Sequence, residues 1–298
     1  MLCPPRRHGD SHATGEPRRP FFDLGTRNAA ACGPPERGPR PSPPRRDHRR
    51  RAHEEGHTKV TSAVSGRPCG AVGALRVKAM PVTLDRREGP YGEVVLRQRG
   101  DHFEIIANGT FLMDTSDGRS ERLLIDAALR ALDGRPEPSV LIGGLGVGFS
   151  LAHAAAQPAW GRIVVVEREQ AVIDWHREGP LGALSGAALA DPRTALVQAD
   201  LVAWLHRTSE TYDALCLDID NGPDWTVTAD NDGLYAPAGL AACAARLNPG
   251  GVLAVWSAQP SEDFEDSLRN AGFSGVRTEE IPVARGVPDV VHLGVRPA

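Results

Sequence analysis

Short apolar runs alternate with stretches of helical spacing over the second half of the chain. In the helical stretches, apolar side chains recur three and four positions apart, whereas the runs between them are continuous. This alternation predicts a parallel sheet that is covered by helices on both faces. The expected strands begin at Val140, Ile163, Ala195, Ala214, Val252 and Val290, and the expected helices cover 120–132, 149–157, 169–178, 201–207, 236–246 and 261–271.

A different pattern precedes this region, between Tyr91 and Asp114. Short β-rich runs are separated there by Gly100-Asp101 and by Asn108-Gly109, which are turn pairs typical of β-hairpins. We therefore expect a small β-hairpin unit of three or four antiparallel strands within residues 80–118. The α/β domain would then cover residues 119–298.

Residues 1–79 differ in composition from the rest of the chain. They contain 16 Lys and Arg against 7 Asp and Glu, and 11 of the 25 prolines, whereas residues 80–298 contain 18 Lys and Arg against 31 Asp and Glu. Their only aromatic residues are Phe21 and Phe22, so they lack the apolar surface that offsets the entropy of folding. We predict a disordered, basic, Pro/Arg-rich tail, and we interpret Met80 as the start of the physiological protein.

The sequence argues against several classes of protein. It has no apolar run of about 18 residues that could span a membrane, nor the apolar core of a secretion signal, so we expect a cytoplasmic protein without a membrane partner. Cys216 and Cys243 lie in apolar stretches without CxxC spacing, which predicts buried thiols and no metal site. The negative balance of residues 80–298 disfavours a nucleic acid as partner.

A glycine loop joins the first expected strand of the α/β domain to the helix after it. We expect the loop to bind a nucleoside ligand, which can approach its backbone closely, through Gly143, Gly144, Leu145, Gly146 and Gly148. Glu167 ends the next strand, 19 positions after Gly148, where a carboxylate can accept hydrogen bonds from both ribose hydroxyls. Phe149 stands where a GxGxxG motif needs its third glycine, which favours S-adenosyl ligands over nicotinamide ones. The alternative is a tight turn without a ligand.

Polar residues follow the next two expected strands. Asp200 and Leu201 come after the third strand, where they could meet an adenine, although Asp200 could equally be the N-cap of the helix that follows. Asp218, Asp220 and Asn221 come after the fourth strand. Ligands of open α/β sheets bind at such carboxyl ends.

In this order, the motifs resemble the class I S-adenosylmethionine-dependent methyltransferase fold. With the β-hairpin unit and residues 218–223, they are most similar to the spermidine synthase (polyamine aminopropyltransferase) family, over roughly residues 90–297. The resemblance implies a doubly wound, mostly parallel seven-stranded sheet of the Rossmann type and a homodimer. It also implies a transferase of polyamine biosynthesis that uses decarboxylated S-adenosylmethionine, or S-adenosylmethionine itself, as co-substrate and needs no metal. The acceptor would be a small-molecule amine such as putrescine, with Asp218 as catalytic base and Asp220 and Asn221 as substrate-binding residues.

The chain departs from the family pattern at three places. Gly146 stands where the family's glycine loop has an aspartate that helps to hold the aminopropyl amine, and Asn221 stands where it has a second acid. Residues 116–121 replace an acidic segment that also carries a tyrosine, and no tyrosine is present. We expect Asp117 and Glu121 to be a helix cap and its capping partner, and we expect the histidines to be structural or solvated.

These departures leave two further functions open. One is a methyltransferase for small molecules, because Gly146 removes a negative charge near the place where intact S-adenosylmethionine carries its carboxylate. The other is a non-catalytic nucleoside-binding paralogue, in which Asp218 would have no chemical task.

Overall fold

The computed structural model describes residues 80–298 apart from 220, 225–230 and 282–286. The predicted tail of residues 1–79 lies outside the described residues, and so does Asp220. No helix in the described part of the chain is long and apolar enough to cross a bilayer.

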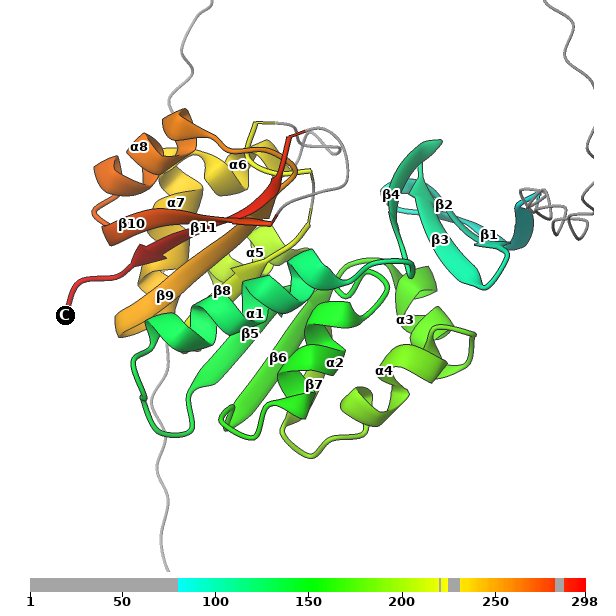
Figure 1. Cartoon of the computed structure of the whole chain (residues 1–298), viewed down its shortest axis with the longest axis horizontal. Helices are drawn as coiled ribbons and strands as arrows, with labels where there is room; N and C mark the ends of the chain where they lie inside the picture. The colour runs from blue at the N-terminus through cyan, green and yellow to red at the C-terminus, as the bar shows by residue number, and fades with distance from the viewer. Residues whose placement is uncertain (1–79, 220, 225–230, 282–286) are drawn as a thin grey trace, which may run out of the picture. The chain divides into compact units, whose positions relative to one another are not determined.

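The first part of the described chain is a four-stranded antiparallel sheet with the order β1-β2-β3-β4 (Figure 1). The predicted turns connect its strands, and Gly100, Asn108 and Gly109 adopt the positive φ angles of 61°, 51° and 78° that such tight turns require. The strands are β1 (Val82–Gly89), β2 (Gly92–Arg99), β3 (His102–Ala107) and β4 (Thr110–Asp114).

The second part is a seven-stranded sheet with the order β10-β11-β9-β8-β5-β6-β7. Its strands are β5 (Ser139–Gly143), β6 (Arg162–Glu167), β7 (Thr194–Gln198), β8 (Tyr212–Leu217), β9 (Leu247–Ser257), β10 (Ser274–Ile281) and β11 (Asp289–Val295). Strands β5 to β9 run parallel to one another, and β11 is antiparallel to both β9 and β10. The predicted doubly wound, mostly parallel sheet is confirmed.

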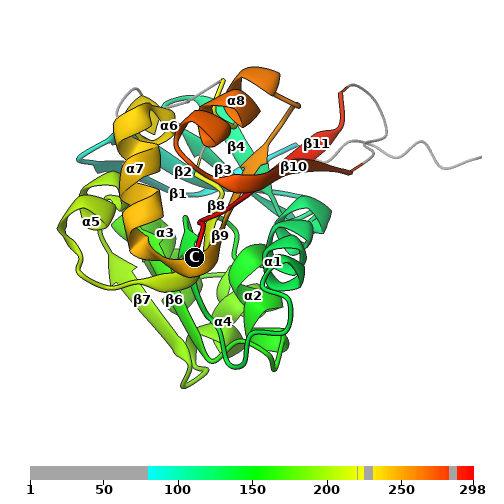
Figure 2. The same ribbon diagram turned by 90° about the vertical axis from the view of Figure 1, so that its left-hand side faces the viewer.

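Helices cover both faces of this sheet, as Figure 2 shows from the side. Alternate residues of each strand point to opposite faces. Ile142 therefore belongs to the core cluster that includes residues of α1, α2, α3 and α4, whereas Leu141 belongs to the cluster that includes residues of α5, α6, α7 and α8. The helices are α1 (Arg119–Ala131), α2 (Phe149–Ala156), α3 (Gln170–Arg177), α4 (Gly182–Leu189), α5 (Leu201–Arg207), α6 (Asp232–Tyr235), α7 (Pro237–Arg246) and α8 (Glu262–Asn270).

Three elements differ from the sequence prediction. The prediction has no strand at β10, which carries Arg277, Glu279 and Glu280 and has no fully buried residue, because it is the edge strand of the sheet. It also has no helix at α4, whose Gly- and Ala-rich sequence is almost equally apolar on all sides. The four-residue α6 is too short to show a helical period.

The amino ends of the central strands are joined by a half-buried carboxylate, that of Asp213 in β8. It accepts hydrogen bonds from the amide and the hydroxyl of Ser139 in β5, both at 2.8 Å, and from Asn248 at 2.8 Å, and it forms an ion pair with Arg135 at 2.5 Å. These donors hold the pKa of Asp213 down at about 2, although burial alone would raise it. Hydrogen bonds and an ion pair therefore fix the amino ends of these strands. The predicted site lies at their carboxyl ends.

Candidate active site

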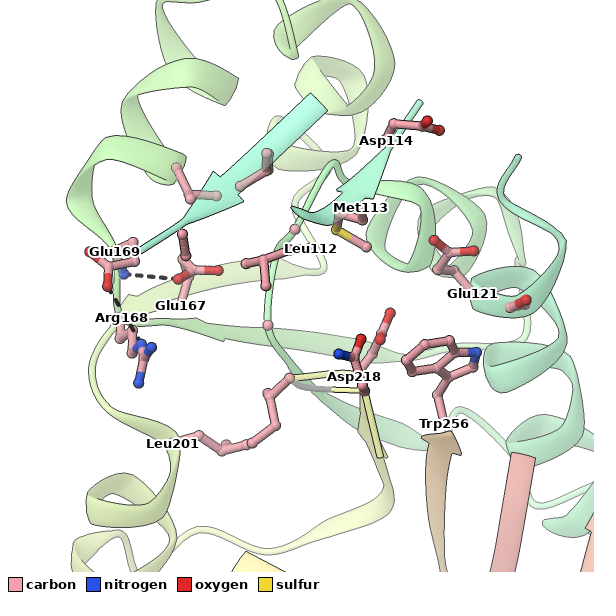
Figure 3. Close-up of a pocket in the computed structure, with 18 of the residues that line it drawn as sticks. Leu112, Met113, Asp114, Glu121, Glu167, Arg168, Glu169, Leu201, Asp218 and Trp256 are labelled. Carbon is pink, nitrogen blue, oxygen red and sulfur yellow. Dashed lines mark hydrogen bonds and ion pairs between the residues drawn. The ribbon is translucent and has the colours of Figure 1, made fainter. Parts of the chain in front are cut away.

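A cavity of about 420 Å³ lies at the carboxyl ends of the central strands (Figure 3). The chain leaves β5 toward β6 and later returns to β8 on the other side of β5, and a ligand crevice is expected where the strand order reverses in this way. The predicted site residues that line the cavity are Gly144, Gly146, Glu167, Asp200, Leu201, Asp218 and Asn221. The structure therefore brings together residues from the ends of β5, β6, β7 and β8.

The glycine loop has a backbone conformation that few side chains tolerate. Gly144, Gly146 and Gly148 have φ angles of 92°, 52° and 98°. A Cβ at Gly144 would lie 2.7 Å from the main-chain oxygen of Asp218, so the loop passes close to the end of β8. Gly143 and Leu145 do not line the cavity: a Cβ at Gly143 would meet Leu201, and the side chain of Leu145 is buried in the core.

Met113 occupies the space beside Gly146. Its sulfur, which comes from β4 of the small sheet, lies 2.4 Å from the position of a Cβ on Gly146 and 3.2 Å from the amide nitrogen of Val147. Figure 3 shows the side chain of Met113 at the cavity, between Glu121 and Leu112. A thioether thus fills the place where a side chain on the glycine loop would be, so this part of the cavity wall has no carboxylate.

His176 of α3 forms a hydrogen bond with the glycine loop. Its Nε2 lies 2.8 Å from the carbonyl oxygen of Gly146, and its Nδ1 lies 2.6 Å from the hydroxyl of Ser185. Because a carbonyl only accepts, we assign the proton to Nε2 and the acceptor role to Nδ1. Burial lowers the pKa of His176, which favours this neutral form. The prediction of a structural histidine is confirmed, but its contact with the loop was not predicted, because 30 residues separate His176 from Gly146.

Glu167 connects the glycine loop to the end of β6. Its carboxylate accepts hydrogen bonds from the amide of Leu145 at 2.9 Å and from the amide of Glu169 at 2.8 Å, and the side chain lines the cavity. Each carboxylate oxygen keeps a further lone pair, so Glu167 can still accept a bond from a ligand hydroxyl. Asp200 is the N-cap of α5, where it accepts from the amide of Ala203 at 2.8 Å, and it also lines the cavity.

Asp218 lies on the floor of the cavity directly after β8. Its main-chain amide donates to the carbonyl of Gly143 at 3.1 Å, which fixes its position relative to the glycine loop. The residue is half-buried, and its carboxyl lines the cavity. Burial, and then the nearby carboxyls of Glu121 and Asp289, raise the pKa of Asp218 to about 8. A carboxylate in this place is a much stronger base than one in water.

Glu121 is a site residue that the sequence analysis missed. The prediction of a capping box between Asp117 and Glu121 is wrong, because the N-cap is Gly118. The carboxylate of Asp117 accepts a hydrogen bond from the amide of Arg119, the first residue of α1, at 3.1 Å, without Glu121 as a capping partner. Asp117 pairs instead with Arg119 at 2.7 Å. Glu121 points into the cavity near Asp218 (Figure 3), and burial is the main cause that raises its pKa to about 7.

Asp289 and Trp256 were also missed. Asp289 is the first residue of β11, lines the cavity and accepts a hydrogen bond from the hydroxyl of Ser120 at 2.7 Å. Trp256 of β9 lines the cavity close to Glu121 (Figure 3). Asp289 stands at the start of an apolar run, so the sequence could have indicated an acid at the end of a strand. The sequence does not show, however, that residue 289 lies near residue 121.

Comparison with known proteins shows two related sequences. The chain is 30% identical over 146 residues to polyamine aminopropyltransferase 2 of Pseudomonas aeruginosa, which covers 48% of this chain and 39% of that protein. It is 35% identical over 95 residues to polyamine aminopropyltransferase 1 of Streptomyces coelicolor, which covers 32% of this chain and 18% of that protein. The chain thus spans less than half the length of either relative. No protein-family model matches it.

Solved structures with the same fold include two spermidine synthases. One is a spermidine synthase in complex with the transition-state analogue AdoDATO, with a TM-score of 0.59, 17% identity and coverage of 72% of this chain and 73% of that one. The other is spermidine synthase from Thermotoga maritima, with a TM-score of 0.58, 17% identity and coverage of 72% of both chains. The structures agree on the fold, and the related sequences agree with the family resemblance found in the motifs.

Proposed function

We propose that this chain is a spermidine synthase-like transferase, which transfers an aminopropyl group from decarboxylated S-adenosylmethionine to a small-molecule amine. The observation that carries the proposal is the carboxyl of Asp218, which shares one cavity with the glycine loop and with Glu167 and whose pKa burial raises. The related sequences are aminopropyltransferases, which supports the same reaction.

The donor fits the half of the cavity that lies over β5, β6 and β7. Glu167 would accept hydrogen bonds from the ribose hydroxyls, and the open backbone of the loop at Gly144 and Gly146 would allow the nucleoside to approach closely. Asp200 and Leu201 would lie beside the adenine. With the nucleoside held in this way, the sulfonium end of the donor would point toward β8, and therefore toward Asp218.

The reaction needs a base but no activation of the leaving group. The nitrogen of the acceptor attacks the aminopropyl carbon that is bonded to the sulfonium. The bond between this carbon and sulfur breaks, and its electron pair stays on sulfur, so that the neutral thioether 5′-methylthioadenosine leaves. The acceptor must lose a proton to free its lone pair, and Asp218 would accept it. The raised pKa of Asp218 brings the carboxyl closer to the pKa of an alkylammonium, which makes the proton transfer less unfavourable.

A methyltransferase is the second candidate, and one observation favours it. The wall at Gly146 carries the thioether of Met113 in place of a carboxylate, so it offers no partner for the ammonium of the aminopropyl group and no repulsion to the carboxylate of intact S-adenosylmethionine. A non-catalytic nucleoside-binding protein is the third candidate, and it predicts that Asp218→Asn leaves the biological effect unchanged.

Calorimetric titration of the full chain separates these candidates. Decarboxylated S-adenosylmethionine, S-adenosylmethionine and 5′-methylthioadenosine are titrated in parallel, and amine products are then sought by mass spectrometry after incubation with the donor that binds. We expect the decarboxylated donor and 5′-methylthioadenosine to bind more tightly than intact S-adenosylmethionine. Tighter binding of intact S-adenosylmethionine would favour the methyltransferase, and no binding of any of the three would refute the nucleoside site. The homodimer and the cytoplasmic location expected from the sequence stay predictions.

A further inference from the structure

We propose that Glu121 and Asp289 bind the ammonium group of the acceptor amine beside Asp218, and that they supply the negative charge that the family pattern places elsewhere. The proposal rests on the proposed aminopropyl transfer, because it names the acceptor site of that reaction. It also explains how the chain can take a cationic substrate although Gly146 and Asn221 replace two acids of the pattern.

Three elements bring the carboxyls together. Asp218 follows β8, Glu121 lies in the first turn of α1, and Asp289 begins β11; all three line the same cavity. In Figure 3, Asp218 lies between Glu167 on one side and Glu121 on the other. The half of the cavity over β8, β9 and β11 is therefore acidic and lies across Asp218 from the half that we assign to the donor.

Among the residues that the structure describes, none forms an ion pair with the carboxylate of Glu121. The residue is nine-tenths buried, with 9% of its surface exposed, and its side chain points into the cavity (Figure 3). Its main-chain amide is the only hydrogen-bond donor that the described residues give it. Arg122 is a cation that acts on Glu121 and lowers its pKa, and its guanidinium lies over the ring of Phe149, 5.2 Å from the ring centre.

Asp289 faces a cation, Arg119, which lines the same cavity and forms its ion pair with Asp117. The hydroxyl of Ser120 bonds to Asp289, but no ion pair with Asp289 occurs among residues 80–298 as far as they are described. Asp117, which also faces Glu121, already has its own partner in Arg119. Buried carboxylates without a cation are costly, so a ligand that brings a positive charge would gain more here than in water.

The surroundings favour an alkylammonium ion over a metal ion. Within the described parts of the chain, no three His, Cys, Asp or Glu side chains form a group that could hold a metal. The adjoining wall includes Trp256 and Ile281, which would pack against the methylene chain of an amine. The ligand class is therefore a primary aliphatic amine whose cationic end lies among the three carboxyls.

Titration with two amines tests the proposal directly. The full chain is saturated with 5′-methylthioadenosine, which fills the donor half, and is then titrated with putrescine or with n-butylamine. We expect Glu121→Gln and Asp289→Asn each to weaken the binding of both amines by about tenfold or more, since hydrogen bonds to charged groups contribute about 1.5–3 kcal/mol. The affinity for 5′-methylthioadenosine should not change, which also shows that the variants are folded.

Glu262→Gln is the matched control. Glu262 lies in the first turn of α8, as Glu121 does in α1, but it is exposed and outside the cavity, so the same substitution should leave amine binding unchanged. Wild-type affinity in Glu121→Gln and in Asp289→Asn would overturn this proposal alone. If the wild-type chain binds 5′-methylthioadenosine but neither amine, the proposed aminopropyl transfer is overturned as well.

Proton release on amine binding is a second measurement, and a purely structural role of Glu121 would not affect it. Burial raises the pKa values of Asp218 and Glu121, so an arriving ammonium should displace protons from them near neutral pH. The binding enthalpy of the wild-type chain should then differ between buffers of different ionisation enthalpy. This difference should decrease in Glu121→Gln, and an unchanged difference would contradict the proposal.

Discussion

Gly146→Ala tests why the glycine loop carries no side chain at the place where the family pattern has an aspartate. The substitution adds only a Cβ, on a residue whose φ is 52° and whose Cβ would lie 2.4 Å from the sulfur of Met113. A non-glycine residue in the left-handed region costs about 1–2 kcal/mol. Because the methionine side chain is flexible, it should move aside and leave its favoured rotamer, which costs about 0.5–1.5 kcal/mol more.

The control for this experiment is Gly100→Ala. Gly100 has a similar φ of 61°, but a Cβ there would meet nothing within 4 Å, so it has the backbone cost without the contact. Thermal unfolding of the two variants should therefore differ by about 1 kcal/mol, or about 2–4 °C in Tm, with Gly146→Ala the less stable. Since the displaced Met113 moves into the cavity, Gly146→Ala should also weaken the binding of 5′-methylthioadenosine, and Met113→Ala in the same chain should restore it. Equal Tm values and an unchanged nucleoside affinity would refute this explanation of Gly146.

Three further predictions concern the catalytic base, the support of the loop and the opposite edge of the sheet. Asp218→Asn should lower kcat about 10²- to 10⁴-fold and leave 5′-methylthioadenosine binding normal. Because burial raises the pKa of Asp218 to about 8, the kcat/KM of the wild-type chain should rise with pH up to that value. A flat pH profile would contradict the role of Asp218 as base. His176→Leu should raise the KM for the donor more than that for the amine, while His176→Gln, whose amide can still donate to Gly146, should recover part of the loss; equal effects on both substrates would indicate a general loss of structure. The pKa of Asp213 lies near 2, below its usual value, so its contribution to stability is complete above about pH 4 and is lost as the pH falls toward 2. The Tm of Asp213→Asn should therefore fall less between about pH 4 and about pH 2 than the Tm of the wild-type chain. Parallel curves of Tm against pH for the two proteins would disprove this.

The sequence predicts the fold well because the buried strands of a parallel sheet are nearly continuous apolar runs. Strands such as β5 and β8 are covered on both faces, so their runs stand out, whereas the edge strand β10 has no such run and was missed. The glycine loop and Glu167 could also be predicted, since one strand–loop–helix unit and the strand after it fix their spacing.

The acidic side of the cavity could not be predicted in this way. Glu121 and Asp289 are 168 residues apart and become neighbours only because α1 packs against β11. The same holds for Met113, which reaches the glycine loop from a different sheet. The spacing of residues in the sequence predicts contacts within one strand–loop–helix unit. The contacts of Glu121, Asp289 and Met113 instead depend on how separate elements pack against one another.

The position of Trp256 gives the protein a built-in optical reporter. Its indole lines the acidic half of the cavity, whereas Trp160 is buried in the core and Trp175 donates from its ring nitrogen to Asp85 at 2.8 Å, away from that half. Filling the acidic half with an amine would change the polarity and the charge around the indole of Trp256, while the surroundings of Trp160 and Trp175 stay the same. Tryptophan emission could thus follow occupancy of the acceptor half in real time without a label, and a Trp256→Phe variant would give the background signal.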